Sequence, residues 1–277
     1  MATQDQIRTH YELEKELAAR IMSAAPENRG RVSLEAYDEL FRRITWHEGL
    51  LNTPELRARQ RRSYDPFLRM VGEGSDILEI GCGNGNQMEA LAPHNKRCVG
   101  IDISDCVLDR QSAMPENVEL MIADASDLSA FADDSFDVAF SKQLIEHIHP
   151  DDVGRHLGEI VRVLRPGGRY ILETPNRLTG PHDISAHFHQ VAVGFHLKEY
   201  SYGELLRRMD QAGFRRYRSP LFRQAMYERR PRLASAAEIP ADWKRPAEFL
   251  VGIMPYRWRR RTGRALRISS VFIEAWV

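Results

Sequence analysis

This sequence has few cysteines, no net charge and no long apolar run. Its three cysteines, Cys82, Cys98 and Cys106, show neither CxxC nor paired-histidine spacing, so we expect no disulfide framework or zinc site and a reducing, cytoplasmic setting. Basic and acidic residues balance at 39 each, which argues against coating of nucleic acid or an anionic membrane. No run of about 18 apolar residues occurs, so no membrane span is predicted. The first residues, MATQDQIRTHYELEK, contain no apolar h-region, so no signal peptide is predicted.

What remains is the composition of an ordinary globular protein. The chain has 277 residues, of which 43% are hydrophobic and 28% charged. A chain of this length suits one large domain or a core domain with additions, and it can bury a sizeable core.

The N-terminal portion indicates helices. Apolar residues recur at three- and four-residue spacing over 4–24 and again over 33–45, where Ser33 is the expected cap. Gly30 interrupts the pattern between the two helices. Residues 1–63 are therefore expected to form either a helical lid over a binding site or an arm for dimerisation, and the pattern does not separate these alternatives.

The middle of the chain alternates short apolar runs with helical stretches. The expected strands are 76–80, 97–102, 118–124, 136–141 and 169–175. The expected helices lie near 86–92, 105–113 and 151–164. This alternation predicts βαβ units and a parallel sheet covered on both faces.

The C-terminal part continues the sheet after an interruption. The stretch 165-RPGG-168 is expected to stop the preceding helix and turn the chain into a strand. The later elements, in order, are a loop at 176–198, a helix at 201–212, a strand near 214–222, an Arg- and Pro-rich run at 223–264 and a last strand at 266–277.

The stretch 76-DILEIGCGNGN-86 carries the first functional signal. A strand that ends in Gly81, Gly83 and Gly85 lets backbone approach a ligand at the start of a helix. No GK[ST] follows, which excludes a P-loop, and Asn86 stands where the third glycine of a dinucleotide motif would be.

Acidic residues close successive strands near these glycines. Glu79 precedes them, while Asp102 and Asp124 end the next two strands. Asp102 can accept both hydroxyls of a ribose, and Ala125 is small enough to lie beside a flat ring. Three carboxylates would repel a pyrophosphate, so the pattern favours a nucleoside that carries positive charge.

In this order and spacing, the motifs resemble those of class I S-adenosylmethionine-dependent methyltransferases, especially the small-molecule branch with a type 11 methyltransferase domain. The motifs, which cover roughly 64–218, are LEIGCGNG, VGIDIS, ADASDL, FDVAFSKQLIEH and LRPGG. The phrases TPNRLTGPHD and GFHLKEYS also resemble bacterial members acting on sugars or secondary metabolites.

The resemblance implies a fold and its division along the chain. The fold is α/β: a Rossmann-like seven-stranded sheet of order 3-2-1-4-5-7-6, with an N-terminal helical lid and an insertion before the last strand, which is antiparallel. The expected parts are a lid or arm at 1–63, a cofactor-binding core at 64–222, a capping insertion at 223–264 and the last strand at 265–277.

The resemblance also implies S-adenosylmethionine as cofactor and S-adenosylhomocysteine as product. The glycines would approach the methionine part, Asp102 the ribose, and Asp124 with Ala125 the adenine, while Ser141 would face the sulfonium. The expected cofactor-binding residues are Glu79, Gly81, Cys82, Gly83, Asn84, Gly85, Asp102, Ile103, Asp124, Ala125 and Ser141.

Histidines gather where an acceptor would bind. Seven of ten lie between 147 and 196, and a hydroxyl nucleophile usually needs a base of this kind. The candidates are His147, His182 and His187. The motif 143-QLIEH-147 resembles an ExxEH metal motif, but Gln143 replaces an anionic ligand, so no metal site is predicted; Glu146 and His147 could instead brace the turn.

Other residues receive less specific expectations. His149 and His156 are expected at the surface or beside a helix N-cap, and His196 is expected to fix the loop before the helix at 201–212 in preference to direct chemistry. The arginines of 229-RRPR-232 and 257-RWRRRTGR-264 could clamp an anionic substrate, although a solvated or oligomer-contact face is favoured. The expected substrate-pocket residues are Tyr11, Trp46, Gln143, Glu146, Asn176, Arg177 and His196; His47 and Tyr64 are further lid candidates.

The predicted function is methyl transfer to a small molecule, a sugar or natural product, with O-methylation ahead of C- or N-methylation. A nucleic-acid methyltransferase is disfavoured because SKQL stands where an NPPY-like motif would be, and no nucleic-acid or membrane partner is expected. A cyclase or a non-catalytic binding protein on the same fold stays open, as does a homodimer.

Overall fold

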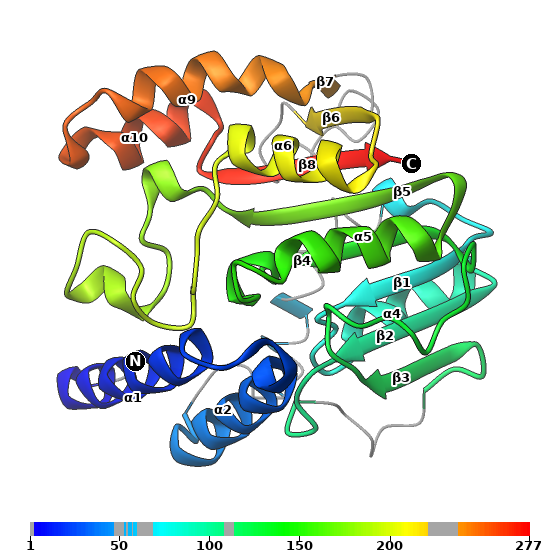
Figure 1. The fold of residues 1–277 in the computed structure, drawn as a ribbon, viewed down its shortest axis with the longest axis horizontal. Coiled ribbons are helices and arrows are strands. Elements are labelled where there is room, and N and C mark those ends of the chain that lie inside the picture. The colour runs from blue at the N-terminus through cyan, green and yellow to red at the C-terminus, as the bar shows by residue number, and fades with distance from the viewer. Residues whose placement is uncertain are drawn as a thin grey trace.

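A single mixed sheet forms the centre of the computed structural model, which describes residues 3–46, 53, 55–56, 58–59, 69–107, 114–220 and 238–277. Helices α5 (Val153–Val163) and α6 (Tyr202–Ala212) lie on one face of the sheet and α4 (Asn86–Leu91) on the other. The pair α1 (Gln4–Met22) and α2 (Arg29–Arg43) lies beyond the strand ends (Figure 1). The predicted α/β architecture is confirmed.

The strand order of the sheet is β3-β2-β1-β4-β5-β8-β6-β7. Its strands are β1 (Asp76–Ile80), β2 (Arg97–Asp102), β3 (Val118–Ile122), β4 (Phe136–Lys142), β5 (Leu164–Pro175), β6 (Arg216–Pro220), β7 (Glu238–Pro240) and β8 (Ser270–Trp276). The first five strands are parallel, and β8 is inserted antiparallel between β5 and β6. This is the predicted order with one addition, the three-residue edge strand β7.

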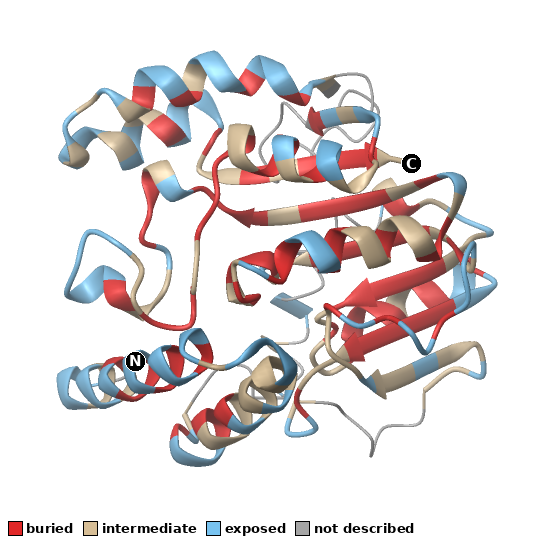
Figure 2. Ribbon diagram, viewed as in Figure 1, coloured by how far each residue is buried: buried red, intermediate tan, exposed pale blue. Residues whose placement is uncertain are grey.

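The strands nearest the centre are buried because their apolar runs are covered on both faces. Every residue of β1 after Asp76 is buried, and Ile77, Leu78 and Ile80 are fully inaccessible. Figure 2 shows the same concentration of buried residues through β1, β2, β4 and β5. The carboxyl ends of the first four strands consequently meet at one firm edge, where the chain can place side chains accurately.

The N-terminal helices differ from expectation at one boundary. Helix α1 begins after Thr3, whose side chain forms a reciprocal capping box with Gln6. Helix α2 begins at Arg29, directly after the 3₁₀ turn η1 (Pro26–Asn28). Ser33 is therefore not a cap but lies within the helix. The start of α2 was placed too late, because Gly30 was expected to separate the two helices and instead lies in the first turn of α2.

The remaining connections are short helical turns and two C-terminal helices. The turns are η3 (Ala92–His94), η4 (Ile145–His147), η5 (Arg177–Thr179), η6 (Ile184–His187) and η7 (Ala241–Lys244). Helices α9 (Arg245–Gly252) and α10 (Tyr256–Leu266) precede β8. Most of the helix expected at 105–113 and the segment 221–237 lie outside the described residues. Within the described part, no helix is both long enough and apolar enough to cross a bilayer.

Candidate cofactor and acceptor site

A cavity of about 290 Å³ lies where the carboxyl ends of β1, β2 and β3 and the loop after β4 face helix α2. This is the edge at which open α/β sheets bind ligands. Its polar lining includes three carboxylates and two histidines, which are Asp102, Asp124, Asp152, His147 and His149. The lining residue Arg29 pairs with Asp152 at 3.1 Å. Its apolar lining includes Ile80, Ile101, Leu144 and Phe41. A largely apolar cavity with a few converging polar groups is typical of a small-molecule site.

The glycine loop after β1 forms one wall of the cavity. Gly81, Gly83 and Gly85 all have positive φ, at 78°, 53° and 73°, a region that other residues adopt at a cost. A Cβ on Gly85 would lie 2.6 Å from a methyl carbon of Leu120, whereas a Cβ on Gly83 would meet no protein atom within 4 Å. Gly83 therefore presents bare backbone to the cavity, as the close approach of a ligand requires.

Asp102 is fixed at the end of β2 by the backbone around it. Its Oδ2 accepts a hydrogen bond from the Gly83 amide at 2.9 Å, and its Oδ1 accepts one from the Ser104 amide at 3.1 Å. Burial raises the pKa of Asp102, although these backbone N–H groups oppose the shift. Each oxygen keeps a further lone pair, so the carboxylate can accept two vicinal hydroxyls.

Asp124 lies at the other end of the cavity, under helix α2. Its Oδ1 accepts hydrogen bonds from both the amide and the hydroxyl of Ser126, each at 2.8 Å. A Cβ on Gly30 of α2 would lie only 2.5 Å from Asp124 Oδ2. The missing side chain of Gly30 thus lets the helix close directly over this carboxylate and the neighbouring Ala125.

Glu79 lies behind the glycine loop and not in the cavity wall. Its side chain is buried, and neither carboxylate oxygen has a hydrogen-bond partner among the described residues. Burial and the charge of Asp102 both raise its pKa well above the usual range, while Lys142 acts in the opposite direction. The raised pKa of Glu79 shows that its surroundings, burial and the neighbouring Asp102, disfavour a further negative charge behind the loop. A cofactor with sulfonium and ammonium groups fits these residues.

His147 is the histidine best placed for acceptor chemistry. It lines the cavity from the turn η4, and its Nδ1 lies 2.9 Å from the carbonyl oxygen of Phe195. A carbonyl can only accept, so Nδ1 carries the proton and Nε2 is the basic atom of the neutral ring. The ring of Tyr37 from α2 meets His147 edge-on at 6.2 Å between centroids.

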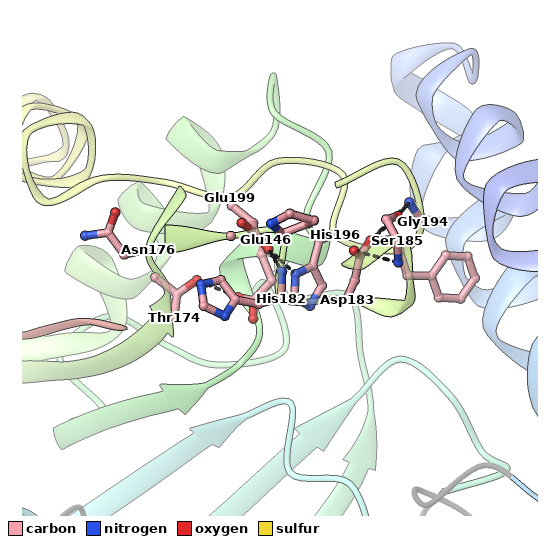
Figure 3. Close-up of polar contacts among 12 residues, drawn as sticks. Glu146, Thr174, Asn176, His182, Asp183, Ser185, Gly194, His196 and Glu199 are labelled. Atoms are coloured by element: carbon pink, nitrogen blue, oxygen red, sulfur yellow. Dashed lines mark hydrogen bonds and ion pairs between the residues drawn. The ribbon is translucent and has the colours of Figure 1, made fainter. Parts of the chain in front are cut away.

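Behind His147 lies a buried acid–base network (Figure 3). Thr174 donates a hydrogen bond to Glu146 Oε2 at 2.8 Å, and His196 Nδ1 lies 2.9 Å from Glu199 Oε1. Burial raises the pKa of Glu146 to about 7. Burial alone would lower the pKa of His196, but the bond to Glu199 and the charge of Glu146 raise it instead.

This network could in principle hold a cation. One donor atom each from Glu146, His147 and His196 lie within 4.8 Å of one another. The contacts of these residues with the loop before α6 already give them a bracing role, because the amide of Lys198 also donates to the Glu146 carbonyl at 3.2 Å. Neither Glu146 nor His196 lines the cavity, although both were expected in the substrate pocket.

The other histidine candidates lie away from the cavity. His182 Nε2 bonds to Thr179 Oγ1 at 3.0 Å on the loop after β5, and burial lowers its pKa. His187 is exposed on η6. Neither lines the cavity, because the loop after β5 runs outward before it returns at Phe195.

Several expected pocket residues are engaged elsewhere in the fold. Asn176 donates to Glu248 at 2.8 Å, and Arg177 pairs with Glu204 at 3.3 Å. Ser141 is fully buried, and its hydroxyl bonds to that of Tyr170 at 2.6 Å, so it faces the core and not the cavity.

The two aromatic lid candidates within the described residues also miss the cavity. Tyr11 bonds through its hydroxyl to His189 Nε2 at 2.6 Å, and Trp46 packs beside the apolar cluster of α1 and α2. His47 and Tyr64 lie outside the described residues. Of the expected pocket residues, Gln143 does line the cavity.

Helix α2 supplies five lining residues that were not expected at the site from the sequence. They are Arg29, Gly30, Ser33, Tyr37 and Phe41. They share one face of the helix, so a correct helix start would have grouped them. Without it, their spacing is that of any amphipathic helix.

Two histidines expected at the surface or beside a helix N-cap are buried. His149 lines the cavity, yet its Nδ1 accepts from the Asp151 amide at 3.3 Å and its Nε2 lies 3.4 Å from the Met22 carbonyl. Nε2 therefore links the last residue of α1 to the core, while Nδ1 holds the turn just before α5. His156 is fully buried and bonds to the Ala125 carbonyl at 2.7 Å, which fixes the end of the cavity that the adenine was expected to occupy.

Comparison with known proteins identifies a domain family in the centre of the chain. Residues 78–172 match a family described as a methyltransferase domain of type 11. A Mycolicibacterium smegmatis protein named "Probable S-adenosylmethionine-dependent methyltransferase" is 33% identical over 141 residues, covering 51% of this chain and 52% of that protein. A Coxiella burnetii ubiquinone biosynthesis O-methyltransferase is 31% identical over 108 residues, covering 38% and 45% respectively. The chain spans about half the length of the curated relatives it matches.

Solved structures share the fold at low identity. An S-adenosylmethionine-dependent methyltransferase from Mesorhizobium loti aligns with a TM-score of 0.52 and 19% identity, over 78% of this chain and 98% of that one. An Archaeoglobus fulgidus counterpart gives 0.53 and 17%, over 85% and 99%. These structural matches confirm the fold. The family match confirms, for residues 78–172, the resemblance of the motifs to a type 11 methyltransferase domain.

Proposed function

We propose that this chain, whose residues 78–172 are a class I S-adenosylmethionine-dependent methyltransferase domain of type 11, methylates a hydroxyl group of a small molecule, a sugar or natural product. The domain takes S-adenosylmethionine as cofactor and leaves S-adenosylhomocysteine as product. The observation that carries the proposal is the position of His147: it faces the same cavity as Asp102, with its proton held on Nδ1 by the Phe195 carbonyl.

The chain's own residues would hold and orient the reactants. The cofactor supplies a methyl group bonded to a positively charged sulfur. Asp102 accepts hydroxyls at one end of the cavity, Gly83 allows close approach, and Asp124 lies at the other end. Helix α2 covers the cavity and excludes water, which aligns the acceptor and limits competing hydrolysis.

His147 would take the proton that the acceptor hydroxyl loses as its oxygen bonds to the methyl carbon and the carbon–sulfur bond breaks. Nε2 is the atom able to accept this proton, because Nδ1 already donates to Phe195. Glu146 lies within reach of the ring, so its carboxylate would stabilise the charge that develops on the imidazole.

Release of S-adenosylhomocysteine with phenol, catechol, sugar and amine acceptors tests the proposal. For the best hydroxyl acceptor, His147→Gln should lower kcat by about a hundredfold or more without changing the Kd for S-adenosylmethionine. The matched control is His187→Gln, which changes an exposed histidine on η6 and should retain full activity.

Two outcomes would contradict the proposal. Unchanged activity in His147→Gln would show that His147 is not the base. Turnover of amines alone would show that the enzyme methylates nitrogen and not oxygen. Binding of S-adenosylmethionine without product release for any acceptor would favour a non-catalytic protein or a cyclase.

A further inference from the structure

Exposed apolar side chains concentrate on the helical segment before the last strand. In the part of the chain that the structure describes, ten large apolar side chains are exposed, and six of them lie between 243 and 266. Trp243, Phe249 and Ile253 are the most exposed of these, at 67 to 68%. Figure 2 shows α9 and α10 as mostly exposed helices at one end of the molecule. Such a concentration is unusual for a surface that faces only water.

The same segment carries a local positive charge. Residues 241–267 hold eight basic and two acidic side chains, within a chain whose total charge is zero. Arg257, Arg261 and Arg264 are exposed and follow i, i+4, i+7 spacing, so they share one face of α10. The segment 241–267 therefore combines exposed arginines with exposed tryptophan, phenylalanine and isoleucine, and Arg257 lies 6.0 Å from the ring centroid of Trp258.

Other arginines of α10 hold this surface rigidly on the sheet. Arg260 donates to the carbonyls of Thr179 and Pro181, at 3.2 and 2.7 Å, and the Tyr256 hydroxyl donates to the Gly180 carbonyl at 3.0 Å. These bonds attach α10 to the loop that follows β5. The α9–α10 segment is thus anchored to the loop after β5 through Arg260 and Tyr256, which are not among the three arginines Arg257, Arg261 and Arg264.

We propose that this α9–α10 surface binds the face of an anionic phospholipid bilayer. Tryptophan and arginine are the residues of interfacial helices, which place apolar side chains among the acyl chains and cations at the headgroups. A second copy of the chain fits poorly, because a two-fold contact would bring the exposed arginines together. Nucleic acid would leave Leu250 and Ile253 without a partner. The inference does not depend on the proposed methyl transfer.

Co-sedimentation of the full chain with phospholipid vesicles tests this inference. Vesicles with about 30% phosphatidylglycerol should bind the protein at least tenfold more tightly than phosphatidylcholine alone, and salt near 0.5 M should weaken binding by about as much. The variant Arg257→Gln/Arg261→Gln/Arg264→Gln should lose about fivefold per arginine. The variant Trp243→Ser/Phe249→Ser/Ile253→Ser should also lose at least about tenfold.

Matched controls change exposed residues elsewhere. Val191→Ser removes an apolar side chain that is 65% exposed, and Arg155→Gln removes an exposed arginine on α5; both should bind vesicles as the unmodified protein does. Circular dichroism checks that each variant folds. Tryptophan fluorescence of the unmodified protein gives a test without substitution, since bilayer-embedded quencher lipids should quench it and Trp243→Phe should reduce the effect.

The inference would be overturned by any of three results. The first is equal binding to charged and uncharged vesicles, and the second is unchanged binding in both triple variants. The third is a dimer in light scattering that the apolar triple variant converts to a monomer, because a second copy would then cover this surface.

Discussion

Asp102 is the residue on which we expect cofactor recognition to depend most. Its two oxygens are aimed into the cavity by the Gly83 and Ser104 amides. The variant Asp102→Asn keeps the size of the side chain but loses the charge and one of these two backbone bonds, because an amide nitrogen cannot accept. Hydrogen bonds to charged groups also contribute more than neutral ones. We expect its Kd for S-adenosylmethionine, measured by calorimetry, to rise at least about tenfold.

Glu119→Gln is the matched control for this charge removal. Glu119 is an exposed acidic residue on β3 that pairs with Arg97 at 3.2 Å. Its loss should leave cofactor affinity unchanged, since surface ion pairs contribute little. Equal weakening in both variants would mean that overall charge, and not the position of Asp102, sets the affinity.

His156 gives a pH prediction. Burial lowers its pKa from the usual 6.5 to about 4, so the folded protein favours the neutral ring. The stability that follows is present above pH 6.5 and is lost as pH falls toward 4. Between pH 7 and pH 5, we expect His156 to cost about 2 kcal/mol of unfolding free energy.

Urea unfolding at the two pH values checks this, with His156→Gln as the non-titrating comparison. The unmodified protein should lose more stability than the variant on acidification. The same loss in both would show that other groups carry the acid sensitivity. The measurement also isolates His156 from Glu146, whose raised pKa has the opposite effect: stability from its protonated form is lost as pH rises toward 7.

At this scale, the sequence predicts cofactor contacts better than acceptor contacts. Gly83, Asp102 and Asp124 follow directly from strand ends, so local order along the chain places them at one edge. His147 meets its partner Phe195 across 48 positions, and His156 reaches Ala125 across 31. Contacts between residues so far apart in the chain cannot be read from sequence spacing. Of the three candidate bases chosen from the sequence, only His147 lines the cavity.

At the scale of elements, helix α2 is the part whose fit to the cavity can be tested most cleanly. Gly30 faces Asp124, whereas Gly158 of α5 has open space where a Cβ would be. Gly158→Ala should therefore raise the unfolding free energy by about 0.5–1 kcal/mol through helix propensity. Gly30→Ala should gain less, because its methyl group displaces either the helix or the Asp124 carboxylate, which Ser126 holds.

Cofactor affinity separates the two alanine variants further. Gly30→Ala should weaken S-adenosylmethionine binding about tenfold or more, because the new methyl group displaces α2 or Asp124, both of which line the cavity. Gly158→Ala should leave the binding unchanged. Thermal unfolding with and without the cofactor measures both effects. Full cofactor affinity in Gly30→Ala would show that α2 does not close on the site.

Element boundaries show where local sequence signals are reliable. Thr3 and Ser201 begin α1 and α6 with capping boxes, and both helix starts agree with the sequence patterns. Helix α2 has no side-chain cap, so no local signal marked its first residue. The short strand β7 was missed for a related reason: three residues paired only at the edge give no periodicity.

At the scale of the whole molecule, the sheet could be predicted because buried parallel strands have a distinct pattern. Continuous apolar runs separated by helices fix β1 to β5. The position of β8 between β5 and β6 came from the resemblance, and the structure agrees. The surface of α9 and α10 could not be predicted from composition, because a local excess of arginine vanishes in a total charge of zero.

The central claim is that the cavity binds a cationic nucleoside and supports methyl transfer from it. Equilibrium titration of the full chain with S-adenosylmethionine, S-adenosylhomocysteine and NAD tests that claim most directly. We predict saturable binding of the first two at one site, competition between them, and no binding of NAD at comparable concentration. Binding of NAD, or no binding of S-adenosylmethionine, would contradict the account.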